Sequence, residues 1–241
     1  MTTGRGVMAV WNDLEPGHEP AFESWYRRQH VPERLGVPGF QEARRYAALQ
    51  GSPRYCAFYW LDSIAVLASP AYRSRLANPT AWTRRMMPRF RNMARTPCVV
   101  AIDKGAGCGG AMSWIAAIGR TEAQSAAPPD GLGEMFDACL RDPACVRLQL
   151  WTCDRSVASL DNPEARFRAN HDVLADWIVC IETADEHSAA EHAGAMAARL
   201  RSEAPQLNLR AAPVYRLLWR MQATEAPAPC ADEDGAVTAG A

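Results

Sequence analysis

His30 is the residue of this sequence best suited to proton transfer, because an imidazole titrates near neutral pH. It ends an amphipathic segment that starts at Pro20, and Pro32 follows two residues later. Pro20 suits a first helical turn and Pro32 disfavours helical geometry just before it, so we predict a helix from about Pro20 to His30. Unpaired carbonyls at that helix end would favour imidazolium and keep the pKa near neutrality. The alternative is that His30 only caps its helix.

A reaction at His30 would also need cations to neutralise an oxyanion and aromatic surface to hold an apolar substrate. Strand alternation puts Tyr55 and Tyr59 on one sheet face and Phe58 and Trp60 on the other. Tyrosine hydroxyls need partners when buried, which favours a pocket, although each aromatic residue could equally be core. Among the aromatic residues we predict that Tyr46 and Tyr59, together with Trp82, bind substrate.

Seven arginines without an intervening acid lie between residues 73 and 95, interleaved with Tyr72, Trp82 and Phe90. Such a run is compatible with nucleic-acid binding, with a solvated face or a face between the two units, or with recognition of a carboxylate or phenolate. The formal net charge of the chain is -1, and 25 of its 26 basic residues are arginine, which is typical of a GC-rich genome. We therefore expect no nucleic-acid partner.

Two further motifs allow cofactor hypotheses. Residues 105–110 match G-x-G-x-x-G, but the sequence after them predicts a strand, whereas a dinucleotide site needs a helix there. His187 and His192 are five residues apart on a predicted helix, so they face different directions and cannot share a metal ion. Haem needs only one axial histidine, and His30 or His171 would be the candidates. We expect no metal and no cofactor.

The first half of the chain reads as β-α-β-β-α-β. The predicted strands and helices are β at 6–12, α at 20–30, β at 41–50, β at 54–62, helices that start at Ser69-Pro70 and Asn78-Pro79, and β at 97–103. In both helix starts a capping side chain stands before a proline at the first helical position. A glycine-rich stretch from Lys104 to Gly110 then separates this half from the next.

The second half repeats the order. Its predicted elements are β at 112–119, α at 132–141, β at 145–153, β at 175–183, α at 186–202 and β at 213–221. We therefore predict an α+β fold of two tandem ferredoxin-like units, residues 1–105 and 106–222, that build a barrel within one chain. Residues 223–241 lack apolar periodicity and are predicted to be a disordered tail.

The first half also resembles a known family. The segments His30-Val31-Pro32-Glu33-Arg34, Val37-Pro38-Gly39-Phe40, Ala43-Arg44-Arg45-Tyr46, Pro53-Arg54-Tyr55 and Ser69-Pro70-Ala71-Tyr72 resemble proteins of the EthD-like group of the dimeric α+β barrel superfamily. The match covers roughly residues 7 to 105. Family members usually carry a glutamate before the histidine, where this chain has Gln29. A carboxylate there would orient the imidazole.

The resemblance implies a cofactor-independent enzyme that acts on a small hydrophobic or aromatic, in some cases anionic, compound. His30 would be the general acid/base, in an isomerase, lyase, decarboxylase or cofactor-free oxygenase. Arg34, Arg45 or Arg85 would bind the substrate and neutralise the oxyanion charge that develops on it. The alternatives are a non-catalytic ligand-binding accessory protein and a haem-binding barrel. Because the tandem units would pair internally, we expect a monomer or a weak homodimer.

Composition is consistent with a large folded core. The chain is 48% hydrophobic and has eight tryptophans. Its eight cysteines include no Cys-x-x-Cys and often fall in apolar runs, so they read as reduced core residues of a cytoplasmic protein. No stretch of eighteen apolar residues occurs, and the first residues lack a signal-peptide pattern, so we expect no membrane partner.

Overall fold

The computed structural model describes residues 5–119, 125–160, 163–164, 174–211 and 213–231. The strands in this part of the chain are β1 (Gly6–Leu14), β2 (Phe40–Ala48), β3 (Tyr55–Leu61), β4 (Phe90–Gly105), β5 (Ala111–Ala117), β6 (Cys145–Cys153), β7 (Trp177–Thr183), β8 (Leu209–Ala211) and β9 (Tyr215–Gln222). Most strand residues are buried, as expected where both faces of a sheet are covered.

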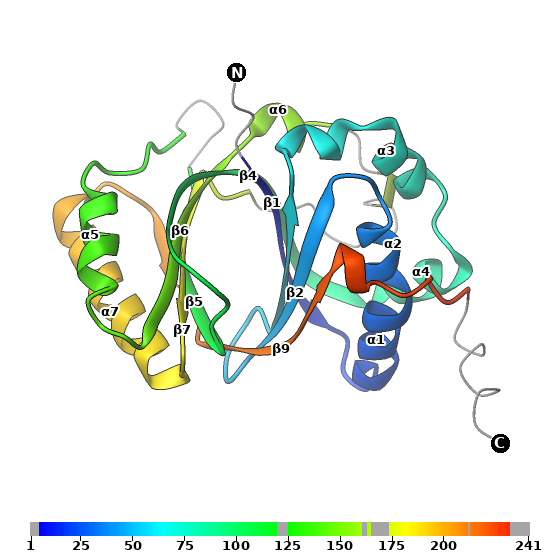
Figure 1. Ribbon diagram of the computed structural model, residues 1–241, viewed down its shortest axis with the longest axis horizontal. Helices are drawn as coiled ribbons and strands as arrows, with labels where there is room; N and C mark the ends of the chain where they lie inside the picture. Colours follow the sequence, from blue (N-terminus) through cyan, green and yellow to red (C-terminus); the bar gives the residue numbers. More distant parts are fainter. Residues whose placement is uncertain (1–4, 120–124, 161–162, 165–173, 212, 232–241) are drawn as a thin grey trace.

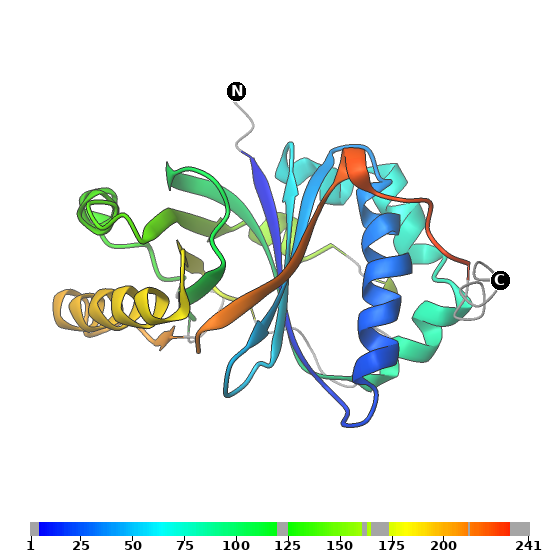
Figure 2. The same cartoon turned by 60° about the horizontal axis from the view of Figure 1, so that its bottom comes forward.

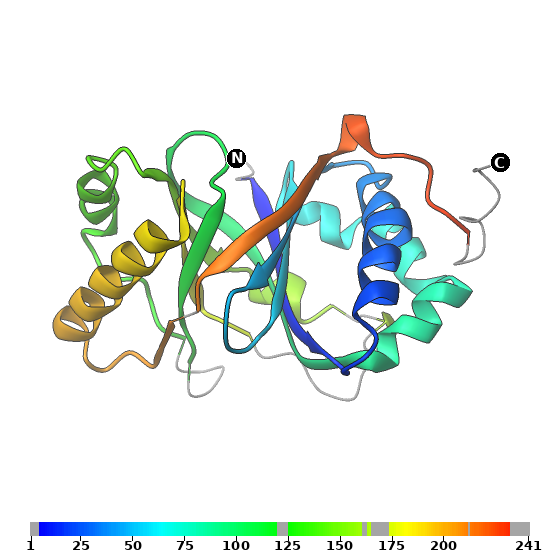
Figure 3. The same cartoon turned by 90° about the horizontal axis from the view of Figure 1, so that it is seen from below.

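The strands pair in the order β7-β6-β4-β1-β3-β2-β9-β5-β8, and β7 also pairs with β5. This last pairing closes eight of the strands into an antiparallel barrel, with the short β8 attached to β5. Strands from the two halves meet twice, where β4 pairs with β6 and where β2 pairs with β9. Figure 3 shows β9, in orange, crossing the molecule from the strands of the second half to β2.

Helices cover the barrel on two opposite sides (Figures 1 and 2). The helices of the first half are α1 (Glu19–Trp25), α2 (Val31–Leu35), α3 (Pro70–Ala77) and α4 (Ala81–Met86), with 3-10 turns at Ile64–Ala68 and Met87–Arg89. Those of the second half are α5 (Leu132–Cys139), α6 (Arg155–Ala158) and α7 (Glu186–Glu203). No described helix is both long enough and apolar enough to cross a lipid bilayer.

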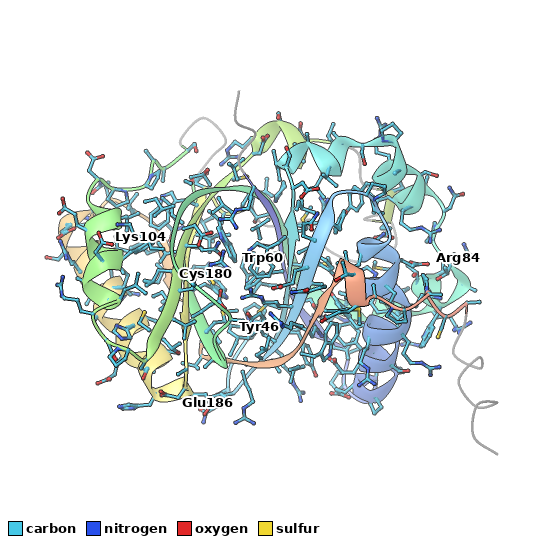
Figure 4. The ribbon with its side chains drawn as sticks, viewed as in Figure 1. Tyr46, Trp60, Arg84, Lys104, Cys180 and Glu186 are labelled. Carbon is cyan, nitrogen blue, oxygen red and sulfur yellow. The ribbon has the colours of Figure 1, made fainter. Side chains whose placement is uncertain are left out.

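The apolar side chains form three layers that follow strand alternation. One layer lies between the first-half helices and the sheet and includes Tyr55 and Tyr59. A second fills the barrel and includes Phe58 and Trp60 from the other face of β3, which confirms the predicted alternation. The third lies beneath α5 and α7. Figure 4 shows Tyr46, Trp60 and Cys180 in the middle of the molecule, where the barrel layer lies.

The predicted helix end at His30 is wrong. Helix α1 continues through a π turn (Tyr26–His30) directly into α2, so His30 lies inside one continuous helical segment. The N–H of Val31 donates to the carbonyl of Tyr26, which adds one residue to the turn and lets the chain pass Pro32. Because His30 is not at a helix C-terminus, the expected support for imidazolium from free carbonyls is absent.

The segment after β9 also differs from the prediction of disorder. Residues 223–225 form a 3-10 turn, and the N–H of Cys230 donates to the carbonyl of Arg28 at 2.9 Å. Proline at position 32 has no N–H to donate to that carbonyl, so Cys230 supplies the missing hydrogen bond. The predicted tail therefore contacts the first-half helix up to Ala231, while residues 232–241 lie outside the described part.

Other predicted boundaries agree closely with the structure, with a few corrections. Ser69 caps α3 as predicted, but α4 is capped by Thr80, whose hydroxyl accepts from the N–H of Thr83, and not by Asn78. Strand β4 starts at Phe90, earlier than predicted, and runs to Gly105. Ala111 then begins β5 directly, so no helix follows the glycine-rich stretch and the dinucleotide motif has no structural support.

Candidate functional site

A small cavity lies between the sheet and the first-half helices, and His30 lines it. The other lining residues are Met8, Val10, Tyr26, Arg34, Phe40, Tyr59, Tyr72, Met87, Phe90, Met93, Arg95 and Glu164. Its volume is about 40 Å³, enough for little more than a water molecule. The cavity thus combines one imidazole, three phenols, two guanidinium groups and one carboxylate in an apolar surrounding.

Aromatic rings surround the imidazole of His30. Its centroid lies 4.4 Å from the ring of Trp25, 5.0 Å from Tyr26 and 6.4 Å from Tyr59. The side chain is buried, with 8% of the residue exposed, and its Nδ1 has no hydrogen-bond partner among the described residues. An imidazole nitrogen without a partner in a buried site is available to a ligand.

Burial holds the pKa of His30 well below its usual value, and the positive charges of Arg34 and Arg45 lower it further. The ring is therefore neutral at physiological pH, whereas the sequence led us to expect a pKa near neutrality. A neutral imidazole can accept a proton as a base without first losing one. The same two cations that keep it neutral would stabilise an anion formed beside it.

Arg34 reaches the cavity from α2 and is paired there with a residue of the second half. Its Nη2 donates to both carboxylate oxygens of Glu164, at 2.5 and 2.7 Å, and both side chains are buried. Its Nη1 is buried without a hydrogen-bond partner among the described residues. Glu164 lies in the connection between β6 and β7, so the second half of the chain closes the cavity of the first.

Arg45 and Tyr59 are the other two predicted residues that the structure brings near His30. Arg45 is fully buried and lies over the rings of Phe22, Tyr26 and Tyr55, at 4.8, 4.2 and 4.6 Å from their centroids. Tyr59 lines the cavity itself. Burial and the neighbouring Tyr26 raise the pKa of Tyr59 well above its usual value, so its hydroxyl keeps its proton.

Three predicted site residues lie elsewhere. Tyr46 follows Arg45 on β2 and therefore faces the barrel interior, where its ring lies 5.7 Å from Phe58. Trp82 is fully buried in the layer beneath the helices but does not line the cavity. Arg85 lies on the exposed side of α4. The structure thus separates these three residues from His30.

The side chain of Gln29, at the position where the resemblance to the EthD-like group implies a glutamate, forms no hydrogen bond with His30 among the described residues. Its Nε2 donates to the carbonyls of Cys230 and Ala231 at 2.6 and 3.0 Å, and its Oε1 accepts from the hydroxyl of Thr80 at 2.6 Å. The side chain therefore connects the first helix to the segment after β9 and to the start of α4. In this chain residue 29 is a structural connector.

Sequence reasoning missed Tyr26, Arg95 and Glu164 as cavity residues. Tyr26 could have been found, because Tyr26, His30 and Arg34 are spaced four residues apart and share one helix face. Arg95 was noted only as part of the arginine run; its Nη2 donates to the hydroxyl of Tyr72 at 3.5 Å. Glu164 carries no local signal, since it is 130 residues from Arg34.

Most of the arginine run pairs with acids or neighbours of the first half. Arg89 and Arg91 contact Glu15, and Arg75 donates to Glu33 at 3.0 Å. These arginines are partly exposed and pair within the first half, which agrees with a solvated face and not with a face between the two units.

The described residues around His30 form neither a three-ligand metal site nor a space of haem size. Among the residues that the structure describes, no three His, Cys, Asp or Glu side chains are close enough to hold a metal ion. The cavity at His30 is about 40 Å³, whereas sites for drug-sized ligands measure about 300 to 1,000 Å³, so neither a haem nor an aromatic substrate enters it without movement of the lining residues. His171, the other predicted haem candidate, lies outside the described residues.

Comparisons with known proteins agree on the fold. No protein-family model and no curated protein matches the sequence. Among solved structures, a "putative monooxygenase" from Fusobacterium nucleatum has a TM-score of 0.57 at 10% identity, over 92% of this chain and 96% of its own. An "anthrone oxidase-like protein" has a TM-score of 0.56 at 10% identity, over 95% of this chain and 97% of its own.

A haem-binding protein from Thermus thermophilus also aligns, with 12% identity over 90% of this chain and 92% of its own, but its TM-score is 0.47 and it supports no inference here. At these identities the likeness concerns the fold and not the chemistry. The chain is therefore an α+β barrel protein.

Proposed function

We propose that this protein is a cofactor-independent enzyme that uses His30 as a general base on a small aromatic compound. The observation that carries the proposal is a neutral, buried imidazole in a cavity with two guanidinium groups and three phenols. That combination is suited to taking a proton from an acidic C–H or O–H bond and stabilising the anion left behind. The His30-Val31-Pro32 segment, which resembles the EthD-like group, supports the same role.

We also propose a tandem ferredoxin-like organisation, with units at residues 1–105 and 106–222. The strands of the first unit pair in the order β4-β1-β3-β2, and those of the second in the order β9-β5-β7-β6, which is the same order by position in each unit. The two units together close one barrel, as two subunits do in a dimer. This supports a monomer in solution.

Neutral His30 accepts a proton from the substrate, and the negative charge that develops on a substrate oxygen is stabilised by Arg34, whose Nη1 has no hydrogen-bond partner among the described residues. Tyr59, which keeps its proton, donates a hydrogen bond to the same anion. Both steps use groups that are already buried and oriented, so little reorganisation is needed during the reaction.

A substrate must replace Glu164 to reach His30. The cavity is too small for an aromatic ring while the carboxylate of Glu164 occupies the Arg34 guanidinium. An anionic or carbonyl oxygen of the substrate would take over that contact as Glu164 moves out. This exchange favours substrates whose reacting carbon is conjugated with an oxygen that takes up the negative charge, such as anthrone and other aryl ketones.

Anthrone is a reasonable first probe, because an anthrone oxidase-like protein shares the fold. Proton loss from its central CH₂ gives an enolate, and reaction with O₂ converts that CH₂ into a second carbonyl with release of one water. Oxygen is the only co-substrate in this scheme, so no cofactor is required.

The test separates proton abstraction from later steps. Anthrone and a panel of aryl ketones are incubated with the protein in D₂O without oxygen, and deuterium uptake at carbon is followed by NMR. We expect catalysed exchange that falls by about 10² to 10⁴ in His30→Gln. His187→Gln, at an exposed histidine of α7, is the matched control and should retain the wild-type rate. Equal exchange by wild type and His30→Gln on every substrate would refute the proposal.

A ligand-binding accessory protein is the second candidate. It is favoured by a second and larger cavity, which lies inside the barrel away from His30. Binding of panel compounds without any deuterium exchange would support this candidate over the enzyme.

A further inference from the structure

A cavity with aromatic side chains in its wall lies at one end of the barrel interior. Its volume is about 380 Å³, within the range of small-molecule sites and much larger than the cavity at His30. The lining residues are Trp11, Ser52, Pro53, Asn92, Met93, Ala94, Thr96, Trp114, Ala116, Ile118, Ala175 and Arg210. None of them is used in the proposed proton transfer.

The cavity exists because small side chains lie at positions where larger side chains normally fill the interior of a barrel. Ala94, Ala116 and Ala175 come from three different segments and all face this cavity. Protein interiors are otherwise packed to the density of organic crystals. The side chains that line a cavity of this size lack the van der Waals contacts that a filled barrel would give them. A ligand would restore those contacts.

Two tryptophans make the apolar wall. The rings of Trp11 and Trp114 have centroids 5.0 Å apart and an interplanar angle of 57°, and each is less than a tenth exposed. Rings in this arrangement provide flat, rigid surfaces for a third aromatic ring at little entropic cost. The wall therefore favours a planar aromatic ligand.

A bulge in β4 shapes the wall beside Trp11. Between Trp11 and Asp13 the register of β1 with β4 shifts, and Asn92 has a φ of 48° there. Left-handed backbone is uncommon for a residue other than glycine and occurs often at binding sites. The bulge brings Met93 to the cavity, where its thioether adds a polarisable apolar contact.

One cation, Arg210, lies in the lining of this cavity. Arg210, on β8, is exposed and forms no ion pair with a described residue. The nearest acid of the bulge, Asp13, already accepts hydrogen bonds from the hydroxyl of Ser52, the amide of Asn92 and the N–H of Arg54. One cation is thus left for a ligand.

We propose that this barrel cavity is a second ligand site, which binds a planar aromatic molecule carrying one negative charge. The ring lies against Trp11 and Trp114, and the anionic group faces Arg210. The site is separate from the cavity at His30, since the two lie on opposite faces of the sheet and share only Met93.

Two probes test the proposal on the full chain. Anilinonaphthalene sulfonate carries one negative charge, and N-phenylnaphthylamine has the same rings without it. We expect saturable binding of one probe per chain, with quenching of tryptophan fluorescence. Arg210→Gln should weaken the sulfonate by roughly two- to fivefold, as for an exposed ion pair, and leave the neutral probe unchanged. Arg201→Gln on α7, another exposed arginine, should change neither.

Filling the cavity gives the second arm. Ala116→Leu and, independently, Ala94→Leu should reduce the affinity for both probes by more than about tenfold, because the added side chain occupies the ring position. Two separate variants are used so that the test remains valid if one of them does not fold. His30→Gln should leave binding intact, so failure of the proposed enzyme and failure of this site are distinguishable. Wild-type affinity in both filled variants, or no saturable binding by wild type, would overturn the proposal.

Discussion

Arg34 and Glu164 are 130 residues apart in sequence and form a buried ion pair at the cavity that contains His30. The arginine belongs to the helical segment of the first half, and the glutamate to the β6–β7 connection of the second. The contact therefore depends on both halves being in place, and it determines how much room the imidazole has. Mutation can separate the contribution of this ion pair to stability from its contribution to the proposed reaction.

We expect Glu164→Gln to lower the free energy of unfolding by about 3 to 5 kcal/mol, because it leaves the Arg34 charge buried without its partner. The double variant Arg34→Met, Glu164→Met should recover most of the loss, since both charges are then gone. Urea denaturation measures the difference. Glu203→Gln, in an exposed pair with Arg199, is the control and should change stability by less than about 1 kcal/mol. A small effect of Glu164→Gln would mean that water replaces the carboxylate.

The stability of the protein should depend on the protonation of His30. Its pKa lies well below the usual 6.5 in the folded protein and returns to that value on unfolding. Between the two values the unfolded chain binds more protons, so stability is fully present above about pH 6.5 and is lost as the pH falls below it. His30→Gln lacks this titration. We expect wild type to lose more stability than His30→Gln between about pH 7.5 and pH 5.5, by up to about 1.4 kcal/mol per pH unit. Parallel pH profiles would contradict the assigned burial.

Arg45→Met should raise the pKa of His30. Removing the cation takes away one of the charges that oppose imidazolium, while burial, the largest cause, remains. The pKa should therefore move toward its usual value without reaching it. An NMR titration of the ring measures the shift. Arg54→Met, at an exposed arginine that does not act on His30, should leave the titration unchanged.

Gln29→Glu should destabilise the protein at neutral pH without orienting His30. The carboxylate cannot donate to the carbonyls of Cys230 and Ala231, which leaves two acceptors facing a negative charge. We expect a loss of about 1 to 3 kcal/mol in urea denaturation. Gln206→Glu, at an exposed position, provides the control and should be close to neutral. A variant as stable as wild type, with a higher His30 pKa, would instead favour the role that the family resemblance implies.

The strands of this fold were predictable because their apolar runs are bounded by glycine, proline and polar residues. Strand β6, Cys145–Cys153, agrees with its prediction at both ends, and strand alternation assigned Tyr59 to the face that carries His30. The short β8 was missed because three residues, Leu209–Ala211, give too little pattern. Local periodicity is thus sufficient to predict long strands and helices, but not strands of three residues.

The site was harder to predict because its decisive contacts are not local. Pro32 was expected to end the helix, but the π turn before it and the N–H of Cys230 compensate for its missing donor. Trp82 and Arg85 were assigned to a pocket from residue type alone, and packing put one in the core and the other at the surface. The sequence around Trp82 and Arg85 contains no pattern that indicates either position.

The layer beneath α5 and α7 contrasts with the one beneath the first-half helices. Phe136, Trp177 and Leu200 fill it without any exposed surface, whereas the first-half layer leaves space beside His30. Two identical subunits could not differ in this way, since one sequence would have to serve both. Within a single chain the closely packed second half stabilises the whole fold. The first half can then contain the unpaired polar groups and strained residues that reactivity requires, although these lower stability.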